Sequence, residues 1–465
     1  MPTISSGINI SLEGVLANTQ AMEIVDHNVS NANTAGYHRQ SAVLTANAPT
    51  AVEGPDRGLG AGQQGNGVTV SNIQRFSLGF YDDRYRSASA QSSNLDAQSS
   101  GLTQLESTLN ETSDSGLIPQ MDQFFTDWQD IASDPSNTSL RSQLLSTASA
   151  LSSAFNTRST SLTQMQNDQD AAIVQNVATI NSVAGQIASL NGQIAQGLAE
   201  GTQPNDLMDK RDTLLDQLAQ VSGAVSSVQK NGEATVFIGG HALVTDTSTF
   251  SLQTSADPLN SNLSKISWQD GQAFTAPNGT LAGELQIRDV DIPNQLKGLD
   301  TLANSFATQV NTLHETGYGL NNAHGLDVFT GTTAATISLN TNLDVNSIGA
   351  SDTIDEPGNN NIANQIANLK SSKVLNGNTQ TLDDFYNAQV TDLATKTQNA
   401  GNNATQSAGV TQSMDDQRQS VSGVSLDEEA ANLSKYQTAY QACARVMTAM
   451  NTMLDTIINS MGVTG

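Results

Sequence analysis

The two ends of the chain carry apolar residues at the heptad spacing of packed helices, and this pattern constrains the fold most. Because a long apolar stripe on a helix needs a partner surface, two such stripes favour pairing of the ends with each other and with neighbouring subunits. The positions predicted to form this interface are Ile8, Leu12, Val15, Met22, Val29, Leu426, Leu433, Tyr436, Tyr440, Met447, Met450, Leu454 and Ile457.

The stretch NVSNANTAGYHRQ follows the first stripe directly. Its asparagines Asn28, Asn31 and Asn33 bond free backbone groups readily, and both Asn and Gly tolerate the left-handed backbone. The stretch therefore predicts the end of the N-terminal helix and a turn at Gly36. We expect Tyr37 to pack against the terminal helices after that turn.

A capping box is predicted where the C-terminal helix begins. Ser425 is followed three residues later by Glu428, the spacing at which the two side chains bond each other's backbone N–H groups.

The middle of the chain changes from helical to β-type patterns and back. Helical periodicity dominates residues 76–220 and returns near 296–310 and 382–420, whereas Asn-Gly and Asp-Gly pairs after residue 230 are typical of hairpins. The predicted fold is mainly α, with coiled-coil-like paired terminal helices, a central elongated helical bundle and a mostly β outer domain. The predicted domains are a terminal helical polymerisation region at 1–50 plus 424–465, an elongated helical domain at 51–220 plus 286–423 with a loop or extended region near 320–360, and a β insert at 221–285.

Charge and composition exclude several classes of partner. The formal net charge is −26, from 45 acidic and 19 basic residues, and the first lysine is Lys210, so a nucleic-acid partner is not expected. The single cysteine, Cys443, excludes a disulfide framework within the chain. No apolar run is long enough for a membrane span, and the absence of a secretory signal predicts, on composition alone, a cytoplasmic protein.

Gly60, Gly62 and Gly65 match the GxGxxG pattern of dinucleotide-binding loops. That loop requires a preceding strand and a following helix, whereas a glycine-rich loop precedes here and GVTV follows. No cofactor is therefore expected.

A metal site is not expected either. His314 and Glu315 begin a string like that of zinc proteases, but Tyr318 stands where the second histidine is needed. The neighbouring His324 adds only proximity in sequence, so both histidines are expected to be solvated residues in loops.

Taken together, NVSNANTAGYHRQ and SGVSLDEEAANLSKYQTAYQACARVMTAMNTMLDTIIN closely resemble the two ends of bacterial flagellar rod, hook and hook-associated axial proteins. Between them, NDLMDKRDTLLDQLAQ, VFIGGHALV and LQIRDVDIPNQLKGLDTLANSFATQVNTLHETGYGL are similar, in the same order, to hook-associated members that join hook to filament. One departure is visible: after Phe329 the chain lacks the large extra β domain of some relatives.

The resemblance implies a structural protein of the flagellum that polymerises through its terminal helices and has no catalytic, cofactor-binding or metal-binding residues. Implied partners are further copies in a ring or tube, the hook protein, a second hook–filament junction protein and an export chaperone at the C-terminal helix. It also implies type III export to the extracellular flagellum, which replaces the cytoplasmic expectation.

The alternative is a secreted enzyme or adhesin that carries flagellar-type ends. It would need a converging set of polar groups in residues 221–345. Glu233, His241 and Asp246 lie there, but no known spacing links them.

Overall fold

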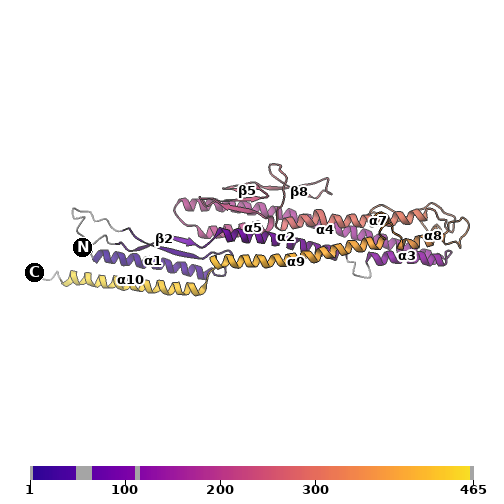
Figure 1. The fold of residues 1–465 in the computed structure, drawn as a ribbon. Helices are drawn as coiled ribbons and strands as arrows, with labels where there is room; N and C mark the ends of the chain where they lie inside the picture. The colour runs from indigo at the N-terminus through magenta and orange to yellow at the C-terminus, as the bar shows by residue number, and fades with distance from the viewer. Residues whose placement is uncertain (1–3, 49–64, 110–115, 461–465) are drawn as a thin grey trace.

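The molecule is elongated, and both ends of the chain lie together at one end of it (Figure 1). The computed structural model describes residues 4–48, 65–109 and 116–460. At the shared end, helix α1 (Ile4–Ser30) packs along helix α10 (Leu426–Ser460). The mainly helical fold with paired terminal helices is thus confirmed.

A two-stranded ribbon links α1 to the body. Strand β1 (Gln40–Ala46) pairs antiparallel with β2 (Val68–Arg75), with a register shift at Val43, and both strands pack against α1. The part of the predicted glycine-rich loop before residue 65, including Gly60 and Gly62, lies outside the described residues.

The body is built from long helices that lie side by side (Figure 1). Asn137 caps α4 by accepting hydrogen bonds from the backbone N–H groups of Ser139 and Leu140. The helices of the body are α2 (Gly79–Leu109), α3 (Leu117–Ser133), α4 (Thr138–Ala199), α5 (Asn205–Ser222), α6 (Thr280–Gln286), a π-helical turn (Ile287–Asp291), α7 (Ile292–His314), α8 (Asn361–Ala367), a 3-10 turn (Asn368–Ser371) and α9 (Leu382–Ser422).

The hairpins predicted at Asn231-Gly232 and Asp270-Gly271 form in small antiparallel sheets on one side of the body (Figure 1). The third predicted hairpin pair, Asn278-Gly279, instead stands at the start of helix α6. Gly232 and Gly271 adopt positive φ angles of 85°, as the hairpin turns require. The strands are β3 (Val225–Val228), β4 (Ala234–Ile238), β5 (His241–Thr245) and β6 (Ser248–Thr249) in one sheet, β7 (Leu252–Ala256) and β8 (Ser264–Trp268) in a second, and the short pair β9 (Phe329–Thr330) and β10 (Ser338–Leu339).

Two buried clusters hold the body together, and α4 contributes to both. Toward the end far from the termini, its residues from Leu144 to Met165 pack with the aromatic rings of α3 and α7. The ring centroids of Phe124 and Phe306 lie 5.1 Å apart there. Its residues from Ile173 to Ala188 pack instead with α5 and the β sheets. The β segment therefore shares a core with two helices, and the division into domains stays a prediction.

His314 contradicts the expectation of a solvated loop histidine. It lies in the last turn of α7 and is buried, with Nδ1 2.6 Å from the carbonyl oxygen of Leu326 and Nε2 accepting from the backbone N–H of Gly349 at 2.8 Å. Burial lowers its pKa to about 4. His324 is exposed, as expected, and its ring lies against Tyr318.

This buried histidine predicts a loss of stability in acid. The folded pKa of about 4 lies below the ordinary value of 6.5, so the unfolded chain binds the proton more readily. The free energy of unfolding should fall as pH drops from about 6.5 to about 4, by as much as about 3 kcal/mol from this group. Urea unfolding of the wild-type protein and of His314→Gln at both pH values measures the difference.

His324→Gln is the matched control, because it removes an exposed imidazole from the next loop. It should keep the wild-type loss of stability in acid, whereas His314→Gln should lose much of it. Identical pH dependence in all three proteins would contradict the prediction.

Candidate assembly interface and its joint with the body

Helices α1 and α10 approach each other through small residues of α1. A Cβ atom added at Gly14 would lie 2.7 Å from Sγ of Cys443, and one added at Gly7 would lie 3.1 Å from Cε of Met450. Ala21, one further heptad along, is buried. Because positions rise along α1 as their partners fall along α10, the two helices run antiparallel, and their close contact depends on residues with little or no side chain.

The predicted apolar stripe of α1 does not form the centre of this contact. Leu12 and Val29 are 42% and 45% exposed, and the remaining three positions are half-buried at the edge. On α10, Leu433, Tyr436, Met447 and Met450 are half-buried, whereas the more exposed predicted positions are Leu426, Tyr440, Leu454 and Ile457.

The residues that face α10 stand one position before the predicted stripe. Gly7, Gly14, Ala21 and Asn28 repeat every seven residues, and this repeat of small and polar residues is the signal that a search for large apolar residues missed. The large side chains of the predicted stripe of α1 are left at the edge of the pair or exposed.

Asn28 joins three elements at the base of the helix pair. Its Oδ1 accepts from the hydroxyl of Tyr37 at 2.7 Å and from the backbone N–H of Gln40 at 2.9 Å. Its Nδ2 donates to the carbonyl oxygen of Gln40 at 2.7 Å and to Oε2 of Glu429 at 3.1 Å. Since Asn28 and Glu429 are 1% and 2% exposed, these bonds satisfy polar groups that water cannot reach.

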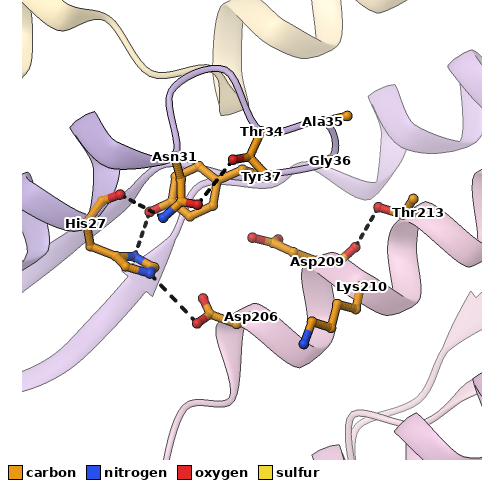
Figure 2. Close-up of a pocket in the computed structure, with 10 residues that line it drawn as sticks. All are labelled: His27, Asn31, Thr34, Ala35, Gly36, Tyr37, Asp206, Asp209, Lys210 and Thr213. Carbon is orange, nitrogen blue, oxygen red and sulfur yellow. Dashed lines mark hydrogen bonds and ion pairs between the residues drawn. The ribbon is translucent and has the colours of Figure 1, made fainter.

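The other residues of the motif shape the turn after α1 (Figure 2). Nδ2 of Asn31 donates to the carbonyl oxygen of His27 at 3.0 Å, at the end of the helix as predicted. Gly36 has a φ of +76°, and a side chain there would collide with the hydroxyl of Thr213. Asn33 is exposed in the turn, so the three asparagines do not share one role.

Tyr37 packs at the end of α1 as predicted, with its ring edge-on to His27. Partial burial and the nearby carboxylates of Asp206, Asp209 and Glu429 raise the pKa of its hydroxyl well above the ordinary value. The hydroxyl therefore stays protonated and donates to Asn28. A hollow of about 230 Å³ separates this turn from α5, lined by His27, Asn31, Thr34, Ala35, Gly36, Tyr37, Asp206, Asp209, Lys210 and Thr213 (Figure 2).

An acidic face of α5 holds the ribbon and the body helices together. The sequence shows this segment only as a charged helix, although three of its aspartates lie at helical spacing. The ion pairs join Arg75 to Asp209 at 2.6 Å and to Asp212 at 2.5 Å, Arg86 to Asp212 at 3.3 Å and to Asp216 at 2.7 Å, and Arg418 to Asp216 at 2.6 Å.

These arginines come from β2, α2 and α9, so α5 connects three separate segments. Burial alone would raise the pKa of Asp212, but Arg75 and Arg86 outweigh it and hold that pKa below its ordinary value. The carboxylate is therefore charged and paired.

The predicted capping box at α10 is half present. The backbone N–H of Glu428 lies 3.5 Å from Oγ of Ser425, as a cap requires. The carboxylate of Glu428 forms an ion pair with Arg39 instead, beside β1. This ion pair is a second contact between α10 and the ribbon, and it replaces the hydrogen bond from the Glu428 side chain that would complete the capping box.

Within the described ranges, no group of three His, Cys, Asp or Glu residues could hold a metal ion, and no helix is long and apolar enough to cross a membrane. Glu233, His241 and Asp246 do not converge: they bond to Asn231, Asp270 and Gln229 respectively.

Comparison with known proteins agrees with this arrangement. The model for the flagellar hook-associated protein FlgK helical domain matches residues 102–329, and the model for the flagellar basal body rod FlgEFG protein C-terminal region matches residues 416–461. Flagellar hook-associated protein 1 of Bacillus subtilis is 30% identical over 512 residues, covering 100% of both chains. The chain belongs to the flagellar hook-associated protein 1 family.

Other relatives support the same assignment. Flagellar hook-associated protein 1 of Escherichia coli is 28% identical over 557 residues, covering 98% of this chain and 100% of its own. The solved structure of the flagellar hook junction protein FlgK from Burkholderia pseudomallei has the same fold, with a TM-score of 0.63 at 17% identity, and matches 73% of this chain and 100% of that one.

Membership in this family of hook-associated proteins makes the protein a structural component of the bacterial flagellum at the hook–filament junction, and not an enzyme. The prediction from the sequence is confirmed in these respects. Both alignments are longer than the 465 residues of this chain, so the relatives carry segments that it lacks. Where those segments lie, after Phe329 or elsewhere, stays a prediction.

The bonds of Asn28 predict that it alone among the motif's asparagines is essential for the joint. Asn28→Ala leaves the carboxylate of Glu429 buried without a donor from α1, and should lower the free energy of unfolding by about 1–3 kcal/mol. Amide hydrogen exchange at residues 28–40 should also become faster. Urea unfolding and exchange of the purified protein measure both.

Asn33→Ala makes the same chemical change in the same motif at an exposed position. Its effect should stay within about 0.5 kcal/mol. Equal effects of the two substitutions would show that the buried bonds contribute nothing specific.

Proposed function

We propose that the protein assembles with further copies of itself into a ring or tube through apolar side chains that α1 and α10 leave exposed. Leu12 and Leu16 on α1 are 42% and 56% exposed, and Ile457 and Ile458 on α10 are 45% and 61% exposed. Single exposed apolar residues are ordinary, but rows of them along two paired helices are typical of an interface. These rows are the observation that carries the proposal.

We keep the interface positions predicted from the sequence and divide them into two groups by their exposure. Half-buried positions such as Tyr436 and Met450 stabilise the pair within one copy, whereas exposed positions such as Leu12, Leu426 and Ile457 contact neighbours. Covering each large side chain contributes roughly 1.5–3 kcal/mol, so a few of them per neighbour are enough to drive association.

Further partners follow from the names of the relatives and from the exposed surface. The relatives are hook-associated proteins, and we propose the hook protein and a second junction protein as neighbours along the axis. An export chaperone would cover the exposed apolar side chains of α10 before assembly. The β segment at 221–285, on the side of the body, would face outward.

Leu12→Asp tests self-assembly without disturbing the monomer. Leu12 is already largely exposed, so the variant should fold and be exported like the wild type. In the assembled state the carboxylate would be buried among apolar side chains, which costs several kcal/mol. A strain whose only copy is Leu12→Asp should therefore show hooks without filaments in electron micrographs.

Asn9→Asp is the matched control. It adds the same charge to the same helix, three residues from Leu12, at an exposed position that is already polar, and should restore filaments. Normal filaments with Leu12→Asp, at matched export, would rule out this face of α1 as an assembly surface.

A further inference from the structure

Helix α10 carries a second apolar stripe, of which the contact with α1 leaves four residues exposed and Ala439 half-buried. Ala439, Ala442, Val446, Ala449 and Met453 follow one another at alternating spacings of three and four residues, which places them along one face. Val446 and Met453 are 46% and 55% exposed, and Ala442 and Ala449 are exposed as well. We call these five residues the alanine stripe.

A different row of α10 faces α1. Cys443 lies against Gly14, and Met450 against Gly7. Each of these contact residues stands one position after an alanine of the stripe. The alanine stripe therefore flanks the contact, and its three alanines leave space for larger side chains of another helix.

The free face of α1 carries side chains of the complementary size. Gly67 of the ribbon lies against Glu13 and Ile10, so the ribbon covers that side of α1. Leu12 and Leu16 remain exposed on a face that neither the ribbon nor α10 covers. Large residues on one helix can thus fill the spaces above small residues on another.

The charges of the two helices are also complementary. Helix α1 contains no lysine or arginine, and Glu23 and Asp26 are exposed on it. Residues 430–454 of α10 contain no acidic residue, whereas Lys435 and Arg445 are exposed there. No ion pair joins Glu23 or Lys435 to another residue in the described part of the chain.

The register of the helix pair brings these charges to one level. Cys443 is level with Gly14, and the helices run antiparallel. Lys435 lies eight residues before Cys443 on α10, and Met22 lies eight residues after Gly14 on α1. Because the helices are antiparallel, Lys435 is therefore level with Met22, which is next to Glu23. Two copies standing side by side at equal height would place the two opposite charges together.

We propose that the alanine stripe of α10 docks on the face of α1 with Leu12 and Leu16 in a second copy of this chain, with Lys435 beside Glu23 of that copy. This deepens the proposed self-assembly and rests on it. The contact is heterologous, since each copy offers its α10 to one neighbour and its α1 to the other. Such contacts close a ring when the copies stand at one height.

Ala442→Glu tests the stripe, with Gln441→Glu as the matched control. Both positions are exposed in the monomer, so both variants should fold and be exported normally. Ala442→Glu should abolish filament restoration, because its charge falls inside the docked face, whereas Gln441→Glu should restore filaments. Restoration by both variants would overturn the proposal.

The Leu12→Asp and Ala442→Glu variants together distinguish failure of the alanine stripe proposal from failure of the proposed self-assembly. If Leu12→Asp fails to restore filaments but Ala442→Glu restores them, self-assembly through α1 is kept and the alanine stripe is rejected as its partner. Restoration by both of these variants rejects the assembly role of the terminal helices as well.

A disulfide tests the register directly. In a Cys443→Ala background, Glu23→Cys combined with Lys435→Cys should give a ladder of linked copies when isolated flagella are oxidised. Lys435→Cys alone should give none. A doubly substituted protein that yields only monomers, although filaments form, would overturn the register.

Discussion

The buried contact between Asn28 and Glu429 is the interaction on which the arrangement of the two ends depends. The residues are 401 positions apart in the chain, yet they share a hydrogen bond inside the protein. A buried carboxylate is costly without donors, so this site is stable only when α1, the turn, β1 and α10 are all in place. The helix pair and the ribbon should therefore form as one cooperative unit.

The acidic face of α5 holds the segments of the body together in the same way. With 19 basic residues in the chain, three arginines are committed to Asp209, Asp212 and Asp216. Buried ion pairs add little net stability over apolar packing, but breaking one leaves an uncompensated charge. The network thus selects one arrangement of β2, α2 and α9 around α5, and fixes the direction in which the terminal helices leave the body.

Much of this architecture could be predicted from the sequence because it rests on local signals. Heptad repeats gave the terminal helices, and glycine at the turns gave the hairpins. The partners of polar residues could not be predicted, since Arg75 and Asp212 are far apart in the chain and nothing in either neighbourhood specifies the other. His314 was misjudged for the same reason: its burial depends on Leu326 and Gly349, which fold back over it.

The candidate interface shows a subtler limit. Periodicity identified the correct helices but did not distinguish the face that meets the partner helix from the face that stays exposed, because it follows large apolar residues alone. Gly7 and Gly14 mark it instead, and the large residues lie beside it. Size, and not only hydrophobicity, decides which rows of a helix can approach another backbone closely.

Helix α4 has a mechanical consequence. Its 62 residues span about 90 Å as one continuous rod. One half is embedded among the aromatic rings of the far end, and the other half lies under the β sheets. Torque applied at either cluster therefore passes along an unbroken backbone ladder, so a rotating shaft could load this subunit along its length without first separating one cluster from the other.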